Sequence, residues 1–179
     1  MARKFPPMQQ VKTIFIVDDD QTQAMMLQDY LSKYSTFTIH LFYSGEECLK
    51  NLSLEPQVIF LDFNFDQAGK DAMNGIEILK EIKARKPETE VVMFSGQDRI
   101  EVAVNTMKHG AFDYIVKSES AFHRSEIAIF NIIKRMKLQG EANLYKRLTL
   151  SFGIAIIVML GVVIFLWKAG LISKNPGWM

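Results

Sequence analysis

Three adjacent carboxylates follow the first apolar run of the chain. Residues 14–17 are Ile, Phe, Ile and Val, and Asp18, Asp19 and Asp20 come directly after them. So much like charge at one strand end has no role in packing, and neighbouring acids repel one another unless water or a cation shields them. Mg²⁺ prefers oxygen ligands and keeps several of its waters, so it suits such a group. The run therefore predicts a cation site, although Asp20 is better placed to cap the helix that follows.

Short runs rich in β-branched and aromatic residues alternate with helical patterns in the first 120 residues. The predicted strands cover residues 13–17, 38–42, 58–61, 91–94 and 114–116. Apolar strands in strict alternation with helices predict a parallel sheet that is covered on both faces and joined by right-handed crossovers. The expected fold class is therefore α/β, a doubly wound five-stranded parallel sheet in the flavodoxin-like order 2-1-3-4-5.

Apolar residues at helical spacing predict the helices between these strands. Ser44 is the expected N-cap of a short helix over residues 46–52, and Gly110 is expected to end the fourth helix. The other helices are marked by apolar stripes: Ala24, Leu27 and Leu31; Ile78, Leu79 and Ile82; Ile100, Ala103, Val104 and Met107; Ile129, Ile132, Ile133 and Met136.

Polar residues close four of the five predicted strands. Asp18 and Asp19 end the first strand, Asp62 the third, Ser95 the fourth and Lys117 the fifth. Ligands of doubly wound sheets bind at the carboxyl ends of the strands. In the order 2-1-3-4-5 these four strands are neighbours, so we expect their terminal residues to converge in one crevice.

In this order and spacing the segments resemble the receiver domains of two-component response regulators, over about residues 11–137. The resemblance rests on five segments of the sequence: Val17-Asp18-Asp19; residues 58–62 with Asn64 after them; Gly75; residues 91–96; and residues 110–117, Gly-Ala-Phe-Asp-Tyr-Ile-Val-Lys.

The resemblance implies that Asp62 is a phosphoacceptor. It would take a phosphoryl group from the phosphohistidine of a histidine kinase or phosphotransfer protein. Asp19, Asp62 and the backbone carbonyl of Asn64 would hold Mg²⁺ directly, and Asp18 would act largely through bound water. An anionic nucleophile and an anionic phosphoryl group need such an ion to absorb their charge.

The same resemblance assigns three further roles. Lys117 would pair with a phosphoryl oxygen, the Ser95 hydroxyl would hydrogen-bond the phosphoryl group, and Tyr114 would be an aromatic switch that turns inward as Ser95 moves. Tyr114 is explained equally well by packing, because tyrosine is common in strands. Such a protein promotes its own phosphorylation and dephosphorylation but is not a turnover enzyme. A hydrolase fits less well, since Asn64 stands where a general acid would be needed.

The chain departs from the receiver pattern in three places. Ser118 follows Lys117 where receivers usually have proline, whose peptide bond to the lysine is typically cis. A cis bond before a residue other than proline costs about 2.5–4 kcal/mol, so the bond from Lys117 to Ser118 can be trans, and Lys117 can then be placed differently. The loop over residues 63–74 is longer than usual and contains two acids, Asp66 and Asp71. A membrane span stands where an output domain is common.

The predicted span covers residues 148–167, which contain no charged side chain. Lys146, Arg147 and Lys168 bracket it, and its length matches the roughly 20 residues that cross a bilayer. The alternative is a buried core helix, which rarely runs this long without a polar face. Ser151 and Ala155 form one small-xxx-small pair, so a homodimer is possible through this helix.

Charge divides the chain before the span. Residues 1–120 carry 13 Lys and Arg against 18 Asp and Glu, a net of −5, and residues 121–147 carry six against two, a net of +4. The acidic part argues against nucleic acid as a partner. The basic part beside the span favours contact with anionic headgroups and places the receiver on the cytoplasmic side of an inner membrane, with the tail on the far side.

The sequence thus predicts five regions: an N-terminal extension (1–10), a receiver domain (11–137), a basic linker (138–147), a transmembrane helix (148–167) and a short tail (168–179). Cys48 is the only cysteine, which fits a reducing compartment, and we expect it to be a small buried hydrophobe. The predicted function is a membrane-anchored, single-domain response regulator that signals through protein contacts. The alternative is a receiver fold that docks a partner at the membrane without phosphorylation.

Overall fold

The computed structural model of the chain describes residues 13–34, 37–65 and 73–169. The backbone divides into two compact units, Met1–Arg135 and Met136–Met179, and each is described by itself. The predicted N-terminal extension, most of the tail and the two loop acids Asp66 and Asp71 lie outside the described residues.

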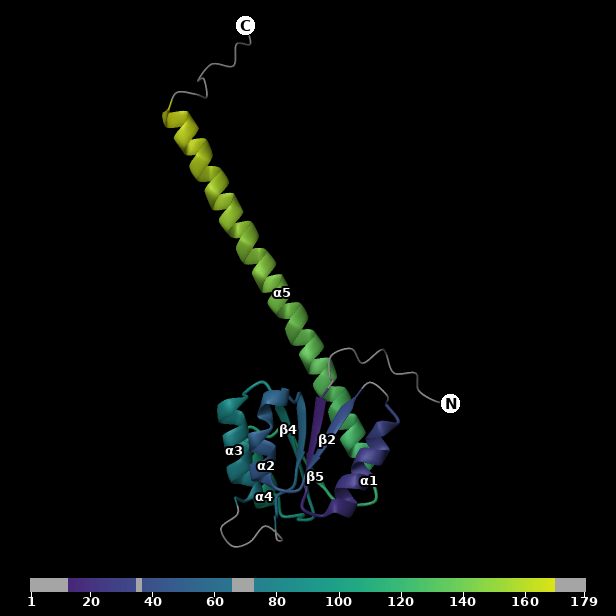
Figure 1. Cartoon of the computed structure of the whole chain (residues 1–179). Coiled ribbons are helices and arrows are strands. Elements are labelled where there is room, and N and C mark those ends of the chain that lie inside the picture. The colour runs from purple at the N-terminus through teal and green to yellow at the C-terminus, as the bar shows by residue number, and fades with distance from the viewer. Residues whose placement is uncertain (1–12, 35–36, 66–72, 170–179) are drawn as a thin grey trace. The chain divides into compact units, whose positions relative to one another are not determined.

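The first unit is built on a five-stranded parallel sheet (Figure 1). Its strands are β1 (Thr13–Val17), β2 (Thr38–Phe42), β3 (Val58–Leu61), β4 (Glu90–Ser95) and β5 (Asp113–Val116). They lie in the order β2-β1-β3-β4-β5, which confirms the predicted topology. All four pairings are parallel, so the strands end at one common edge, which we call the carboxyl edge.

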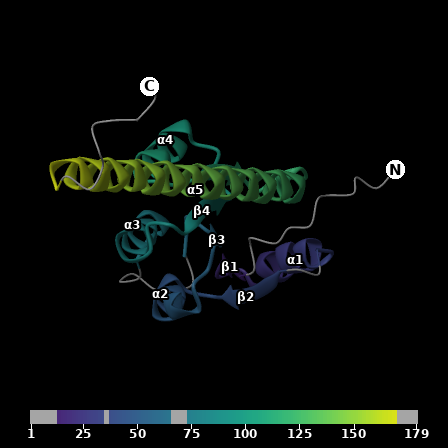
Figure 2. The same ribbon diagram turned by 90° about the horizontal axis from the view of Figure 1, so that it is seen from above.

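Helices cover both faces of this sheet. They are α1 (Gln21–Ser32), α2 (Gly45–Lys50), the short 3₁₀ helix η1 (Leu52–Leu54), α3 (Gly75–Arg85), α4 (Ile100–Lys108) and α5 (Ala121–Lys168). Helix α1 lies on one side of the strands, and α2 and α3 lie on the other (Figures 1 and 2). On the side of α1, the Tyr30 hydroxyl donates a 2.9 Å hydrogen bond to Glu126 of α5.

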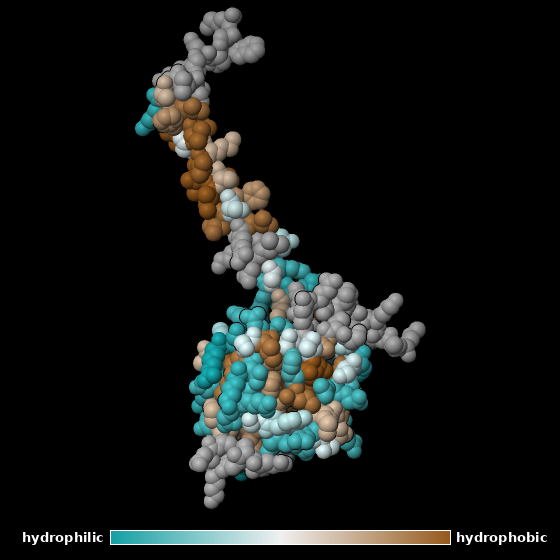
Figure 3. All heavy atoms as spheres, in the orientation of Figure 1, coloured by the Kyte–Doolittle hydropathy of each residue, from teal (hydrophilic) through white to brown (hydrophobic). Residues whose placement is uncertain are grey.

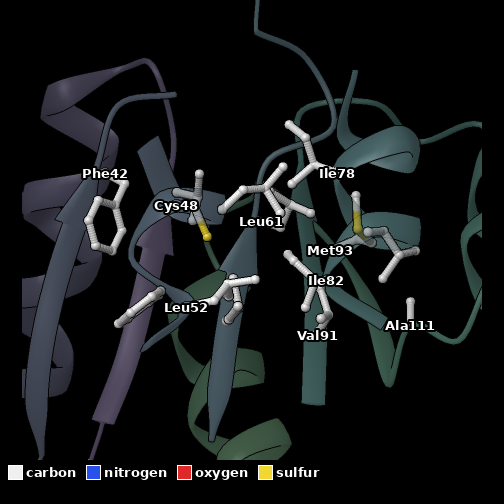
Figure 4. Close-up of a cluster of buried hydrophobic side chains, with 14 of the residues drawn as sticks. Phe42, Cys48, Leu52, Leu61, Ile78, Ile82, Val91, Met93 and Ala111 are labelled. Carbon is white, nitrogen blue, oxygen red and sulfur yellow. The ribbon is translucent and has the colours of Figure 1, made fainter. Parts of the chain in front are cut away.

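The core between α2, α3 and the sheet consists of alternate strand residues and the apolar stripe of each helix (Figure 4). Leu61 and Met93 from the strands pack with Ile78 and Ile82 from α3, and all four are inaccessible to solvent. Cys48 of α2 is also fully buried in this cluster, as predicted, and burial raises the pKa of its thiol to about 12. The thiol therefore stays protonated and packs as a hydrophobe.

Helix α4 forms where its apolar stripe predicted it, but three residues of that stripe lie on the surface. Ile100, Val104 and Met107 are 75%, 47% and 46% exposed, whereas Thr106 is fully buried. The Thr106 hydroxyl donates to the carbonyl of Ala103 at 2.8 Å, so its burial leaves no polar group unsatisfied. The helix can therefore turn its threonine toward the sheet and leave an apolar stripe on the surface.

Side chains at the carboxyl edge cap the first helices. Asp20 accepts hydrogen bonds from the backbone N–H groups of Thr22 (2.9 Å) and Gln23 (3.2 Å), which confirms its predicted capping role at α1. Ser44 accepts from Glu47 N at 3.2 Å and caps α2, also as predicted. Of the three adjacent acids, Asp18 and Asp19 are therefore the two that remain for a cation.

Helix α5 continues through Gly140 without interruption. In the second unit, residues Leu148–Lys168 have a mean hydropathy of 2.7 over their most apolar window, and none of that window is buried. Their apolar side chains form a continuous brown surface in Figure 3. This segment is long and apolar enough to cross a membrane, and it is not a buried core helix in this structure.

Candidate functional site

Two buried carboxylates lie side by side at the carboxyl edge. Asp18 follows β1 and is 2% exposed, and Asp62 follows β3 and is 7% exposed. The pairing of these strands sets their separation, because Asp62 N donates to the carbonyl of Val17 at 2.9 Å. Asp19 completes the group, since carboxylate oxygens of all three acids lie within 4.8 Å of one another. The predicted convergence of these strand ends is therefore observed.

Lys117, which follows β5, reaches into this acid cluster. Its Nζ lies 2.6 Å from Asp18 Oδ2 and 3.0 Å from Asp62 Oδ2. Its backbone N–H donates to the carbonyl of Ser95 at 2.7 Å, which fixes the start of the turn. The described residues contain no cis peptide bond, so the bond from Lys117 to Ser118 is trans. Replacement of the usual proline thus does not keep the lysine from the acids.

Burial dominates the electrostatics of the cluster. It raises the pKa of Asp62 to about 6, with the charge of Lys117 opposing this shift and that of Asp18 adding to it. Burial also raises the pKa of Asp18, again against the effect of Lys117. For Lys117, burial lowers the pKa, but attraction to the two acids outweighs this and the net pKa is raised. One ammonium group therefore lies beside two carboxyl groups whose pKa values are both raised.

The donor set fits Mg²⁺. Three carboxylates from Asp18, Asp19 and Asp62 supply hard oxygen ligands close enough to share one ion. One oxygen of Asp62, Oδ1, is held by the backbone N–H of Phe63 at 2.6 Å, which fixes the orientation of this carboxylate. A divalent cation would add the positive charge that a single lysine does not provide.

The raised pKa of Asp62 predicts that Mg²⁺ stabilises the protein more at pH 7 than at pH 5. The folded-state pKa of about 6 lies above the ordinary value of 3.8, so the folded state holds the proton more tightly, and the contribution of Asp62 to stability is greatest below about pH 4 and is lost as pH rises through 6. Mg²⁺ binds the ionised form, so protons compete with it at pH 5. At a tenfold excess over its dissociation constant, Mg²⁺ adds about 1.4 kcal/mol at pH 7.

Thermal melting with and without Mg²⁺ at both pH values measures this effect. We expect a rise in Tm of several degrees at pH 7, a smaller rise at pH 5, and almost none in Asp62→Asn. Asp98→Asn is the matched control, because Asp98 is an exposed acid that does not belong to the cluster. An equal rise in Tm for wild type and Asp62→Asn would contradict a site at these carboxylates.

The other predicted residues meet at Gln97, which was not predicted as a site residue. Its backbone N–H donates to Ser95 Oγ at 3.2 Å, and its carbonyl accepts from the Tyr114 hydroxyl at 2.8 Å. Its side-chain amide donates to Asn64 Oδ1 at 3.4 Å. Ser95 is fully buried and Tyr114 is 8% exposed. No pattern in the sequence points to Gln97, because only the folded loops bring these groups together.

The structure confirms the packing role of Tyr114, and its role as a switch stays a prediction. Its ring belongs to the core cluster between the sheet and α2 and α3, so it contributes to packing. Its hydroxyl is nevertheless tied to the loop after β4 by the bond to Gln97. A change in that loop would therefore act on the tyrosine directly.

Known proteins share this architecture and these sequence segments. The family described as Response regulator receiver domain matches residues 14–127. The nitrogen assimilation regulatory protein NtrX of Azorhizobium caulinodans is 37% identical over 139 residues, which make up 76% of this chain and 29% of that protein. The transcriptional regulatory protein ZraR of Salmonella typhimurium is 33% identical over 104 residues, 58% of this chain and 22% of that protein.

A solved structure of a receiver domain has a similar fold. The receiver domain of NtrX from Brucella abortus is 29% identical, with a TM-score of 0.60, and the match covers 68% of this chain and 98% of that domain. The chain spans only between 22% and 39% of the length of curated relatives such as these. The similarity therefore concerns one domain of those proteins.

Proposed function

Since the chain belongs to the family of response regulator receiver domains, we propose that it is a membrane-anchored response regulator phosphorylated on Asp62. One observation carries the assignment: Asp62 is a buried carboxylate with a raised pKa at the end of a central strand, in contact with Lys117 and beside two further acids. No packing role requires this arrangement, and buried ionisable groups with perturbed pKa values are typical of functional sites.

Asp62 would act as the nucleophile. An oxygen of its carboxylate attacks the phosphorus of a phosphohistidine on the partner, the P–N bond breaks as the P–O bond forms, and the imidazole leaves and takes up a proton. Lys117 would shift from the acids to a phosphoryl oxygen and offset its charge. Mg²⁺, held by Asp18, Asp19, Asp62 and the carbonyl of Asn64, would supply the remaining charge stabilisation.

The signal would pass through the loop after β4. The Ser95 hydroxyl would donate to the new phosphoryl group while its oxygen accepts from Gln97 N, so a movement of Ser95 toward the phosphoryl group would pull on Gln97, which also holds the Tyr114 hydroxyl. Helix α4 begins three residues after Gln97 and carries the exposed apolar stripe of Ile100, Val104 and Met107. We propose that this stripe is the surface through which the phosphorylated protein contacts its partner.

The apolar segment Leu148–Lys168 would anchor the protein as a single-pass span. The excess of Lys and Arg in residues 121–147 supports an orientation with the receiver unit on the cytoplasmic side, where a histidine kinase or phosphotransfer protein would meet it. The alternative of a scaffold independent of phosphate was motivated partly by Ser118. Its support is weaker because Lys117 reaches both acids across a trans bond.

Phosphodonor labelling of the full chain in lipid nanodiscs tests the assignment. Incubated with phosphoramidate and Mg²⁺, the wild type is expected to gain an acid-stable, alkali-labile phosphate, because an acyl phosphate hydrolyses in base. Asp62→Asn should gain none, since its amide is not a nucleophile, and the exposed-acid control Asp98→Asn should label as the wild type does. Equal labelling of wild type and Asp62→Asn would refute phosphorylation at Asp62.

A further inference from the structure

The first unit carries opposite charges at the two ends of its strands. At the carboxyl edge, ten acids stand against three cations among the described residues. The acids are Asp18, Asp19, Asp20, Glu46, Glu47, Asp62, Glu77, Asp98, Glu101 and Glu119, and the cations are Arg99, Lys117 and Arg124. The local net charge is 3 − 10 = −7, so this edge repels any anionic surface.

The opposite edge, where the strands begin and helices α2 to α4 end, is basic. We call it the basic edge. Its described cations outnumber its acids by seven to five: the cations are Lys50, Lys83, Arg85, Lys86, Lys108, Lys134 and Arg135, and the acids are Glu55, Glu81, Glu88, Glu90 and Asp113. Several of the acids are already paired, as Glu90 is with Lys83 and Arg135 at 3.6 and 3.3 Å.

Three exposed lysines give the basic edge its available charge. Lys50, Lys108 and Lys134 stand at or near the ends of α2, α4 and the part of α5 that belongs to this unit. They belong to none of the ion pairs found among the described residues. Their ammonium groups are therefore free to meet an external anion.

The chain also leaves the first unit at this edge. Arg135 is the last residue of the unit, and its guanidinium contacts Glu90, the first residue of β4. Residues 136–147 then connect it to the apolar segment that begins at Leu148. In the continuous helix α5 they rise about 18 Å along its axis. Part of that rise lies within the headgroup region, so a tilted helix allows the basic edge to reach the headgroups of the bilayer that holds the span.

We propose that this charge separation orients the receiver unit on an anionic membrane, with the basic edge against the lipid headgroups and the Asp62 edge turned toward solvent. This inference rests on the proposed membrane anchor. Headgroups of anionic lipids attract cations within a Debye length of about 8–10 Å, and they repel the strongly acidic opposite edge. The phosphoacceptor would then always face the compartment from which the kinase approaches.

Fluorescence resonance energy transfer from a dye on the protein to a dye on the lipid headgroups measures this orientation. The full chain is reconstituted in vesicles with an acceptor dye on the lipid headgroups, and a membrane-impermeant donor is attached to Ser53→Cys at the basic edge or to Thr22→Cys at the carboxyl edge. Both positions are exposed and uncharged, and the native Cys48 is buried, with its pKa raised to about 12, so it does not react.

In vesicles that contain phosphatidylglycerol, we expect more transfer from position 53 than from position 22. The difference should shrink in pure phosphatidylcholine and in about 0.5 M salt, which shortens the Debye length. The triple variant Lys50→Gln, Lys108→Gln, Lys134→Gln should lose it as well. Each cation near an anionic surface shifts the ratio of oriented to free units by about fivefold, so the three together account for roughly 100-fold.

The double variant Lys80→Gln, Arg99→Gln is the matched control, because both residues are exposed cations outside the basic edge. It should behave as the wild type. Equal transfer from the two positions, or a difference that survives in the triple variant, would overturn the proposed orientation. Flotation of the same vesicles distinguishes failure of the membrane anchor from failure of the orientation. A chain that does not float with lipid refutes the anchor. A chain that floats but shows equal energy transfer from positions 53 and 22 refutes only the orientation.

Discussion

Replacing Lys117 with methionine is expected to lower the free energy of unfolding at pH 7 by about 3 kcal/mol in the absence of Mg²⁺. The lysine Nζ lies 2.6 Å from Asp18 and 3.0 Å from Asp62, and the side chains of these acids are only 3% and 9% exposed. Methionine preserves most of the apolar stem but leaves two buried carboxyl groups without their cation. The loss of stability therefore comes from the repulsion between those two acids and from their poor solvation.

The pH dependence identifies this cause. Without Lys117 the pKa of Asp62, already raised by burial to about 6, rises further, so both acids take up protons readily at pH 5. The loss of stability should therefore be smaller at pH 5 than at pH 7. Denaturant unfolding at the two pH values measures it. The double variant Asp18→Asn, Lys117→Met should recover part of the stability, because only one buried carboxylate remains.

The same substitution should slow labelling of Asp62 by about 10²-fold, the cost of removing one charged donor from a developing anion. Lys80→Met, which removes an exposed lysine in the middle of α3, is the control and should change neither stability nor labelling. If Lys117→Met were as stable as the wild type at pH 7, the ion pairs seen in the structure would not be maintained in the Mg²⁺-free protein. Unchanged labelling would remove Lys117 from the proposed mechanism.

The position of this lysine illustrates which features could be predicted from sequence. Strand order and direction follow from alternating apolar strands and helices, and parallel pairing then brings the strand ends together. Leu61 pairs with Val17 and Met93, so the residue after each strand meets its neighbours at one edge. Asp18, Asp62 and Lys117 were identified for this reason. Their convergence at one edge could be predicted without knowledge of the side-chain conformations.

Features that depend on contacts between loops, or on the rotation of a helix, could not be predicted in this way. Gln97 contacts Asn64 and Tyr114 only because two loops meet at the carboxyl edge. Helix α4 has apolar residues on more than one face, so periodicity alone did not show that Thr106 is buried and Val104 exposed. The threonine satisfies its own hydroxyl within the helix, which a count of apolar residues does not register.

Gly140 is a similar case. A glycine inside a helix costs about 1 kcal/mol relative to alanine, so the sequence around Gly140 is compatible with a break or with a continuous helix. The structure shows a continuous helix from Ala121 to Lys168. Local propensity of this size is easily outweighed by the favourable helical residues on either side of one glycine.

Gly75→Ala is the second substitution for which a large effect is expected, a loss of about 3 kcal/mol in unfolding free energy. An added Cβ would overlap the carbonyl oxygen of Asp62 and lie 2.7 Å from Phe63 Cα. Both are backbone atoms, which cannot move aside as a flexible side chain can. The first turn of α3 is also bonded to this backbone, because Gly75 N donates to the carbonyl of Phe63 at 2.9 Å.

Relief of this clash must move either α3 or the backbone that carries the proposed phosphoacceptor. Helix α3 is held by its buried side chains Ile78, Leu79 and Ile82, so we expect the Asp62–Phe63 segment to move and the Phe63 N–H to lose its 2.6 Å contact with Asp62 Oδ1. Labelling of Asp62 should then fall at least tenfold under conditions where the variant is still folded.

Gly96→Ala is the matched control, because it lies at the same edge and its added Cβ meets nothing within 4 Å. Its stability should stay within about 1 kcal/mol of the wild type, and its labelling should be unchanged. If Gly75→Ala lost stability but labelled normally, α3 rather than the Asp62 segment would be the part that moves. If it kept its stability, the close approach of α3 to this backbone would not exist in solution, and the geometry that holds Asp62 would have to come from β3 alone.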